Sequence, residues 1–501
     1  MLLRAMTTAA DWHQQGRLLQ QQRRLQEAEL AYNEALRLAP DRLATLNNLA
    51  ILKRDQKNFH QSQVLLWRGL RRAQQQWQTG QDQQQLCIDW ARLLHSSAQL
   101  ALEQGDIALA LKLNQHVLQL APEGSGYVNY GVSLDAMGRN AEAERSHLLG
   151  LQRHKLSGKP EDWVGRDLGE PPHSSQVQTE LSNLATSRLR QQPLQWQNWE
   201  LLLSRLGKDP SIWLQSPLPW SQLWRGEWVA ELVVWDEQGF GDALQCLRWM
   251  GMACENVDQV TLMLRASLMR LVHQRLKLPS NCRLEILNDH QAPLQKGNRH
   301  CPLMGLPVAL YQRHASINPW PSASQVGPML TSITNTNLGA AKRIGLVWQA
   351  GSKAEADAQR SSEMRSIPCE LLISHALAWC KEGQAELISL QLGEPQQHIQ
   401  PFIQQGLISQ LSGCQDWEDT ASIVEELDLV VSVDTAMVHL AGNLGVPCVV
   451  LLNAVHDWRW GLATEPMHWY HKQTLLRCSK LNAWDALLHK ADLVVNGLLR
   501  A

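Results

Sequence analysis

The sequence lacks the features that mark exported, zinc-binding or globally basic proteins. Its ten cysteines form no Cys-x-x-Cys pair and no His spacing typical of a zinc site, so we interpret them as free thiols in a reducing compartment. A formal net charge of −2 excludes a globally basic nucleic-acid binder. The first twelve residues contain one Arg and too little apolar sequence for a signal peptide, which predicts a cytoplasmic protein.

Long uninterrupted apolar runs are also missing. The most apolar stretch, residues 427–452, is broken by polar residues and a proline that a membrane-spanning helix would not tolerate. These are Asp428, Asp434, His439, Asn443 and Pro447. We therefore expect this stretch in a protein core. With 501 residues, of which 44% are apolar and 19% charged, the chain should fold into two or three domains.

Residues 9–155 contain a repeating pattern typical of the tetratricopeptide repeat (TPR), whose unit is about 34 residues. The first unit has small, aromatic and helix-ending residues in the expected places, namely Gly16, Ala28, Tyr32, Ala35 and Pro40. Weaker units follow, and a Gln-rich spacer at residues 74–85 breaks their period. We predict an α-solenoid of about four repeats. Its concave groove either binds a peptide or protein partner or only supports the domain behind it.

Residues 156–225 have no clear period and are rich in Pro, Trp and Gln. They predict a helical bridge. Its tryptophans could form a platform for a substrate, but so many of them more often pack between domains, and we favour packing.

After residue 225 short apolar runs alternate with polar loops and helices. Residues 229–235 predict a strand, followed by a Gly-containing loop at 236–242 and a helix at 243–253. Residues 343–348 predict a second strand, before a polar loop and a helix that begins at Pro368. Residues 427–452 predict a strand–helix–strand unit with Gly445 after the helix. Ligands of parallel sheets bind at the carboxyl ends of the strands, which here carry polar loops.

In six ordered segments of residues 223–498 the chain resembles glycosyltransferase family 9, the ADP-heptose:lipopolysaccharide heptosyltransferase-like proteins, in the bacterial subgroup preceded by TPR repeats. The segments are 235–242 (WDEQGFGD), 301–307 (CPLMGLP), 343–348 (RIGLVW), 365–368 (RSIP), 431–442 (VSVDTAMVHLAG) and 457–460 (DWRW). The resemblance implies a GT-B fold, a pair of Rossmann-like lobes that follows the α-solenoid. It places an acceptor lobe at 226–335 and a nucleotide-sugar lobe at 336–501.

The resemblance also assigns site residues. Asp242 is implied as the general base, in an acceptor loop with Glu237, Gln238, Gly239 and Gly241. The implied donor-binding residues are Ser352, Lys353, Asp434, Thr435, Ala436 and His439. The family usually has Gly where this chain has Ala436, so the donor sugar stays open.

The resemblance implies transfer with inversion, without a cofactor, the nucleotide-sugar being a substrate. The chain has no Asp-x-Asp motif, which agrees with a metal-independent site. Three hypotheses follow, in order of preference. They are a transferase with a glycan or lipid-linked acceptor, a protein glycosyltransferase whose repeats capture the polypeptide, and a non-catalytic TPR adaptor with a degenerate transferase domain.

Overall fold

A computed structural model describes most of the chain. The described residues are 8–80, 83–122, 124–154, 175–193, 195–207, 222–255, 257–287, 299–313, 328–332, 341–351, 362–380, 385–462 and 469–500. They form two compact units, Met1–Leu156 and Ser157–Ala501. Among the described helices none combines the length and the apolar character that crossing a membrane requires.

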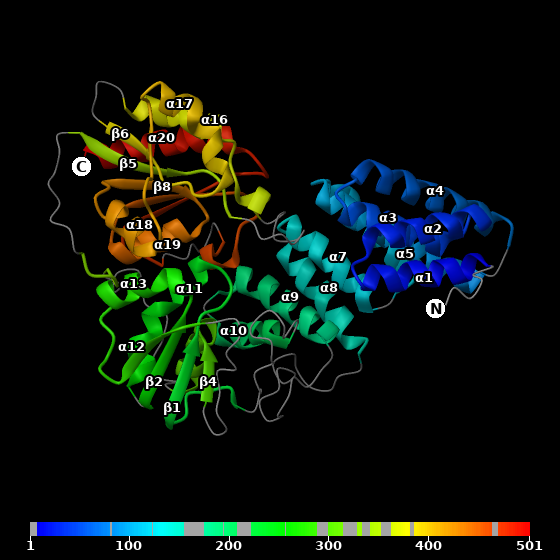
Figure 1. The fold of residues 1–501 in the computed structure, drawn as a ribbon, viewed down its shortest axis with the longest axis horizontal. Helices are drawn as coiled ribbons and strands as arrows, with labels where there is room; N and C mark the ends of the chain where they lie inside the picture. Colours follow the sequence, from blue (N-terminus) through cyan, green and yellow to red (C-terminus); the bar gives the residue numbers. More distant parts are fainter. Residues whose placement is uncertain are drawn as a thin grey trace. The chain divides into compact units, whose positions relative to one another are not determined.

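The first unit consists of helix pairs, with each pair packed on the next (Figure 1). The pairs are α1 (Ala9–Gln21) with α2 (Leu25–Leu38), α3 (Leu43–Asp55) with α4 (Phe59–Gln78), α5 (Gln83–Glu103) with α6 (Ile107–Leu120), and α7 (Gly124–Ala136) with α8 (Asn140–Gln152). The predicted array of helical repeats is confirmed.

Close approach of paired helices explains the glycines of the repeats. A Cβ atom on Gly16 would lie 2.6 Å from the ring of Tyr32, which fills the space between α1 and α2. In the last pair His147 fills the same kind of space, because a Cβ on Gly131 would lie 2.5 Å from its ring. Only glycine leaves room for these rings.

The Gln-rich spacer that breaks the repeat period, residues 74–85, is mostly helical in its described residues. Its residues lengthen the end of α4 and the start of α5, and these helices have 20 and 21 residues. Gln is a good helix former, so a run of glutamines extends helices until Gly80 ends α4 with a positive φ.

The second unit begins, within the described residues, with a helical segment that leads to the sheets. It contains α9 (Ser175–Gln191), α10 (Trp196–Leu202) and the 3₁₀ helix η2 (Leu203–Gly207). Trp199 is buried, and its ring centroid lies 6.3 Å from that of Trp249, 4.8 Å from that of Trp458 and 6.5 Å from that of Trp469. This packing role agrees with the expectation for the tryptophans of the segment.

A four-stranded parallel sheet follows, in the order β3-β2-β1-β4. The strands are β1 (Val229–Trp235), β2 (Val257–Leu264), β3 (Cys282–Ile286) and β4 (Arg299–Pro302). The associated helices are α11 (Phe240–Cys246), η5 (Leu247–Trp249), α12 (Met250–Cys254), α13 (Ala266–Arg275), η6 (Leu303–Gly305) and α14 (Leu306–Arg313). We call this part, residues 222–313, the first lobe.

A six-stranded parallel sheet forms the second lobe, residues 341–500, in the order β10-β9-β8-β5-β6-β7. The strands are β5 (Lys342–Val347), β6 (Ala385–Ser389), β7 (Ser409–Gln410), β8 (Leu429–Val433), β9 (Cys448–Leu452) and β10 (Gln473–Arg477). The helices are α16 (Cys369–Trp379), η9 (Glu394–Ile399), α17 (Gln400–Gln404), α18 (Trp417–Val424), α19 (Ala436–Leu444), η10 (Trp458–Trp460) and α20 (Trp484–Arg500).

Helices cover both faces of the larger sheet (Figure 1). Apolar side chains of α16 and α20 pack with those of β5, β6, β8 and β9 in one buried core. Helices α18 and α19 lie on the opposite side. The predicted strand–helix–strand unit is confirmed, including Gly445, which ends α19 with φ of +74°. The sequence prediction of helical repeats followed by a parallel-sheet α/β region is therefore correct.

Strand order places a topological switch point in each sheet. Numbered along the chain, the strands of the six-stranded sheet read 6-5-4-1-2-3, which is the doubly wound order, and the strand order reverses between β5 and β8. The four-stranded sheet has the same order for its first four strands, with the switch between β1 and β4. Loops that leave the carboxyl ends of β1, β5 and β8 are thus the expected ligand-binding loops of this topology.

Candidate functional site

The loop after β1 presents Asp242 at the start of α11. Gly239 is the N-cap residue, and its backbone N–H donates to Oδ2 of Asp242 at 2.8 Å. Gln238 has φ of +60°, a left-handed conformation that reverses the chain before the helix. The second carboxylate oxygen of Asp242, Oδ1, forms an ion pair with Arg459 of the second lobe.

Two buried acidic residues at the start of the loop after β1 hold it in place through ion pairs. Asp236 forms two hydrogen bonds with the Arg265 guanidinium, at 2.6 and 2.9 Å. Glu237 pairs with Arg205 of η2, and its side chain is fully buried. Burial raises the pKa of both acids, and the arginines oppose that rise. Glu237 therefore lies away from solvent, as an anchor of the loop.

The loop after β8 combines a carboxylate oxygen that lacks a hydrogen bond with a helix that lacks a side-chain cap. Oδ2 of Asp434 is buried and has no hydrogen-bond partner in the described part of the chain, although Nη1 of Arg365 lies 3.7 Å away. Burial raises the pKa of Asp434. Thr435 is the N-cap residue of α19, but its side chain makes no capping hydrogen bond and lies 3.1 Å from the Ser432 hydroxyl.

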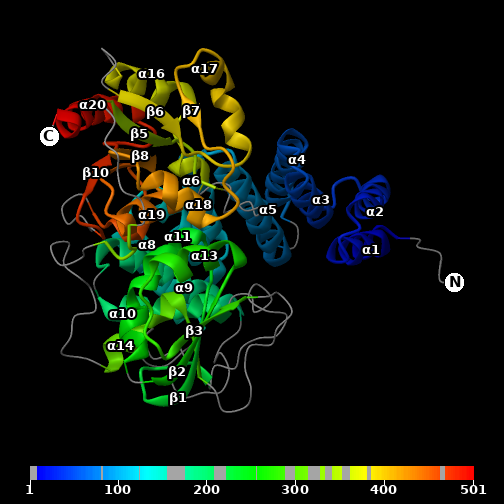
Figure 2. The ribbon, with the colours of Figure 1, turned by 60° about the vertical axis from the view of Figure 1, so that its left-hand side comes forward.

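The two loops come together because α11 packs on α19 (Figures 1 and 2). A Cβ atom on Gly241 would lie 3.0 Å from the His439 ring and 3.4 Å from Cα of Ala436. Asn443 of α19 donates to the carbonyl oxygen of Leu244 at 2.8 Å. A side chain at Gly241 would require the His439 ring to shift by a few tenths of an ångström, so glycine favours the close approach of the two lobes.

His439 lies behind this contact and is neutral at physiological pH. Its Nδ1 lies 2.9 Å from the Tyr470 hydroxyl, and its ring stacks on Trp460 at a centroid distance of 5.6 Å. Burial, helped by the positive charges of Arg459 and Arg248, lowers the pKa of His439 to about 3. The structure thus gives His439 a packing role, while direct contact with a donor stays a prediction.

Arg459 connects the acids of both lobes. Its Nε donates to Oε1 of Gln245 at 2.9 Å and its Nη1 to Oδ1 of Asp457 at 2.8 Å, in addition to the ion pair with Asp242. Burial opposes its charge, but Asp242 and Asp457 outweigh that effect and raise its pKa. A permanent positive charge therefore lies beside the proposed base.

The loop after β5 lies next to β8, since Val347 pairs with Ser432. Gln391 fixes its start by accepting hydrogen bonds from the backbone N–H groups of Trp348 and Gln349, at 3.2 and 2.9 Å. The predicted donor residues Ser352 and Lys353 come directly after this loop's described part and lie outside the described residues.

The structure brings together most of the residues implied by the resemblance. Asp242 and Gly241 lie beside Ala436 and His439, across the contact of α11 with α19. The sequence alone assigns no role to Arg459 or Gln245. A signal existed for Arg459, because it belongs to a segment that carries the family resemblance.

The comparisons identify the repeats. Residues 9–42 match the family model of the tetratricopeptide repeat. A comparison with curated protein sequences finds no match. Among solved structures, Pseudomonas aeruginosa PilF is similar with 15% identity and a TM-score of 0.27, over 39% of this chain and 82% of that one.

Similar solved structures also include two transferases. E. coli ADP-heptose LPS heptosyltransferase II is similar with 13% identity and a TM-score of 0.37, over 54% of this chain and 98% of that one. E. coli heptosyltransferase WaaC, solved with ADP-2-deoxy-2-fluoro heptose, is similar with 10% identity and a TM-score of 0.36, over 53% of this chain and 99% of that one. At these scores the likeness establishes neither a shared activity nor a shared ligand.

Proposed function

We propose that the second unit is an inverting, metal-independent glycosyltransferase of the GT-B type. It moves a sugar, heptose-like or other, from a nucleotide-sugar to a glycan, lipid-linked or protein acceptor. One observation carries this proposal: the loop after β1, which contains Asp242, contacts the loop after β8, which contains Asp434 and leads into α19. Both loops leave strands at the switch points of their sheets. Four of the segments that resemble glycosyltransferase family 9 supply these loops and their arginines.

In this proposal the second lobe holds the donor. Backbone N–H groups at the start of α19 have no side-chain cap and bear the positive end of the helix dipole, which suits a diphosphate. Arg365 and Lys353 add positive charge. Oδ2 of Asp434, which lacks a hydrogen bond, can accept one from a sugar hydroxyl. That bond would satisfy a buried oxygen whose unmet hydrogen-bonding capacity costs folding free energy.

Asp242 acts as the general base in this proposal. As the acceptor hydroxyl attacks the anomeric carbon, its proton passes to the carboxylate, and the bond from that carbon to the diphosphate breaks with inversion. Both oxygens of Asp242 already hold partners, Gly239 and Arg459, yet a carboxylate has about four lone-pair directions and can accept a further hydrogen bond. Arg459 offers positive charge near the diphosphate leaving group.

The proposal also assigns a function to each segment of the chain. Residues 9–155 recruit the acceptor or a protein partner, 156–225 form a bridge, 226–335 bind the acceptor and 336–501 bind the nucleotide-sugar. The protein would work in the cytoplasm without a cofactor.

A second candidate function is a non-catalytic TPR adaptor. The engagement of both Asp242 oxygens favours it, because a degenerate site could retain this ion pair for stability alone.

A binding screen tests the proposal. Purified full-length protein is titrated by calorimetry against a panel of nucleotide-sugars and the matching free nucleotides. We expect one class of nucleotide-sugar to bind with one site per chain, and Asp434→Ala to weaken that binding. Failure of every donor to bind a folded protein would favour the adaptor.

A further inference from the structure

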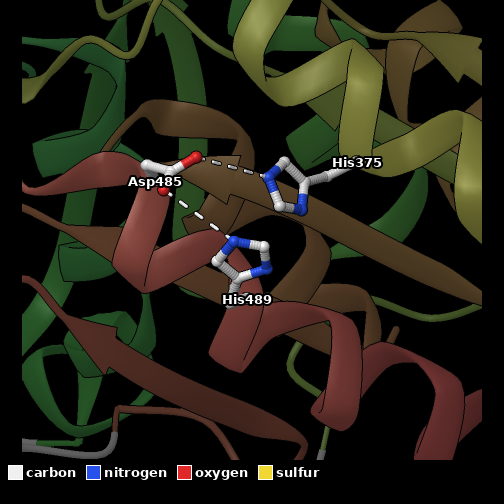
Figure 3. A group of neighbouring side chains, drawn as sticks. All are labelled: His375, Asp485 and His489. Carbon is white, nitrogen blue, oxygen red and sulfur yellow. Dashed lines mark ion pairs between the residues drawn. The ribbon is translucent and has the colours of Figure 1, made fainter.

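A cluster of imidazoles and carboxylates lies where α16 and α20 pack together in the second lobe (Figure 3). We call it the His375 cluster: His375 of α16 with Asp485, His489 and Asp492 of α20. The three residues of α20 are spaced by four and three positions, which places them on one face of the helix. The cluster shares no residue with the candidate site described above.

The orientation of the two imidazoles is the decisive feature. Each ring turns Nδ1 toward Asp492 and Nε2 toward Asp485. From Oδ2 of Asp492 the Nδ1 atoms lie 2.9 Å away on His375 and 3.7 Å away on His489. The Nε2 atoms lie 4.0 Å (His375) and 3.8 Å (His489) from the carboxylate oxygens of Asp485.

Asp492 is held in place to orient His375. Its Oδ1 accepts a hydrogen bond of 2.8 Å from the indole Nε1 of Trp379, a buried residue of the core, while its Oδ2 meets Nδ1 of His375. A carboxylate on Nδ1 fixes the proton on that nitrogen and leaves the lone pair of Nε2 free to bind a ligand. The same arrangement orients metal-ligating histidines in proteins.

The distances between the two Nε2 atoms and the Asp485 carboxylate suit a metal ion bound between these groups better than direct contacts of imidazole with carboxylate. Distances of 3.8 and 4.0 Å are too long for hydrogen bonds, and one ligand atom from each of His375, Asp485 and His489 lies within 4.8 Å of the others. In a tetrahedral site, metal–ligand distances of about 2.0–2.2 Å around Zn²⁺ place ligand atoms roughly 3.3–3.6 Å apart, so a spacing near 4.8 Å would have to shorten by more than about 1 Å on binding. Asp485 and His489 are 72% and 69% exposed, so they can move inward.

We propose that the His375 cluster binds a divalent transition-metal ion, for which Zn²⁺ is the best-matched probe. Nε2 of His375, Nε2 of His489 and a carboxylate oxygen of Asp485 are its protein ligands, and water completes a tetrahedral shell. Asp492 is the positioning residue. The ion links α16 to α20, two helices that cover the same face of the sheet, and so ties the C-terminal helix to the second lobe.

The sequence alone predicts no zinc site, because its Cys and His residues lack the close spacing typical of zinc ligands. His375 comes from a helix more than a hundred residues before α20, and only the packing of the helices brings it to Asp485 and His489.

The test uses tag-free full-length protein that has been freed of metal with a chelator. Zn²⁺ alone is titrated in competition with a chromophoric chelator, and Co²⁺ is added in parallel, since its visible absorption reports tetrahedral coordination. We expect one ion per chain. His489→Ala and Asp485→Asn should weaken binding by about 100-fold or more, and Asp492→Asn by about 10–100-fold, the range for partners of metal-bound histidines.

His398→Ala is the matched control, because His398 is an exposed histidine of η9 outside the cluster, and its loss should change nothing. Circular dichroism confirms that each variant is folded, and the nearly isosteric Asp485→Asn replaces any variant that is not. Zn²⁺ binding by Asp485→Asn and His489→Ala as tight as by the unmodified chain would overturn the proposal. So would the absence of stoichiometric binding to the unmodified chain. Neither result bears on nucleotide-sugar binding, which is measured separately.

Discussion

In the proposed function Asp242 both accepts a hydrogen bond that holds the start of α11 and acts as the general base. Asp242→Asn separates these two roles. Asn keeps the shape and can still accept from Gly239, but it cannot take a proton. We expect turnover to fall by about 100-fold or more. Donor affinity should persist. Folding stability should fall by only about 1.5–3 kcal/mol, because Arg459 keeps Asp457 and Gln245 as partners.

Asp457→Asn is the control for this experiment. It weakens the other ion pair of Arg459 and leaves the proposed base untouched. Steady-state kinetics with a donor from the binding screen and a verified acceptor should show more remaining turnover in Asp457→Asn than in Asp242→Asn. Equal losses would mean that Asp242 serves only to hold Arg459.

Asp434→Ala should act on binding instead. It removes the buried oxygen that we expect to accept a donor hydroxyl, and a hydrogen bond to a charged group contributes about 1.5–3 kcal/mol, or roughly 10–100-fold in Kd. The variant should still fold, since burial raises the pKa of Asp434 and its ion pair with Arg365 is long, at 3.7 Å. Calorimetric titration with the donor measures the Kd. An unchanged Kd would place the sugar elsewhere.

The lowered pKa of His439 should make the folding stability depend on pH, and a mutation of this residue can isolate the effect. Its pKa is lowered to about 3 in the folded chain by burial, against about 6.5 in the unfolded chain. Between these values the unfolded state binds one more proton, so stability falls as pH falls. The slope is about 1.4 kcal/mol per pH unit. Denaturant unfolding of the chain and of His439→Gln from pH 6.5 to 4.5 should differ by this slope, and parallel curves would contradict the assignment.

Helices α13 and α18 join the two lobes through a buried arginine. Arg275 is fully buried and bonds to Glu418 at 2.8 and 2.9 Å, and also pairs with Glu425. Arg275→Met would remove the positive charge that two buried carboxylates share, which should cost about 3–5 kcal/mol of folding free energy. Arg270→Met, on the same helix, removes exposed pairs with Asp416 and Asp419 and should destabilise the fold far less, because solvent screens exposed ion pairs.

Denaturant unfolding measures both variants. Equal effects of Arg275→Met and Arg270→Met would show that the buried pair does not hold the lobes together. If Arg275→Met fails to fold, a variant that also makes Glu418 and Glu425 apolar should recover the fold, because no unpaired charge then remains buried.

Single elements were well predicted where local sequence decides them. Strand β8, helix α19 and its end at Gly445 follow from an apolar run, a polar turn and a glycine that adopts positive φ. The pairing of Arg459 with Asp242 could not be predicted, because the two residues lie 217 positions apart in the sequence and only the contact between the lobes joins them. Helix α11 begins at Phe240, earlier than expected, since Asp242 accepts from Gly239 inside the first turn.

At the scale of the whole molecule, the proposals assign metal and nucleotide to separate places. In the proposed function, Arg365, Arg459 and the start of α19 supply the positive charge for the diphosphate, so that no ion would be required there. The His375 cluster holds its ion between two helices on the face of the sheet opposite α19. Removing metal should therefore affect stability and binding differently.

We expect EDTA to lower the Tm of metal-loaded protein and to leave the Kd for the nucleotide-sugar unchanged. A ligand at about a hundred times its Kd stabilises the folded state by about 2.7 kcal/mol, so loss of the ion should be visible in a calorimetric scan. His489→Ala is the control, because its Tm should not respond to EDTA. If EDTA abolished nucleotide binding while the protein stayed folded, the diphosphate would depend on a metal, and the proposed roles of α19 and the arginines would be wrong.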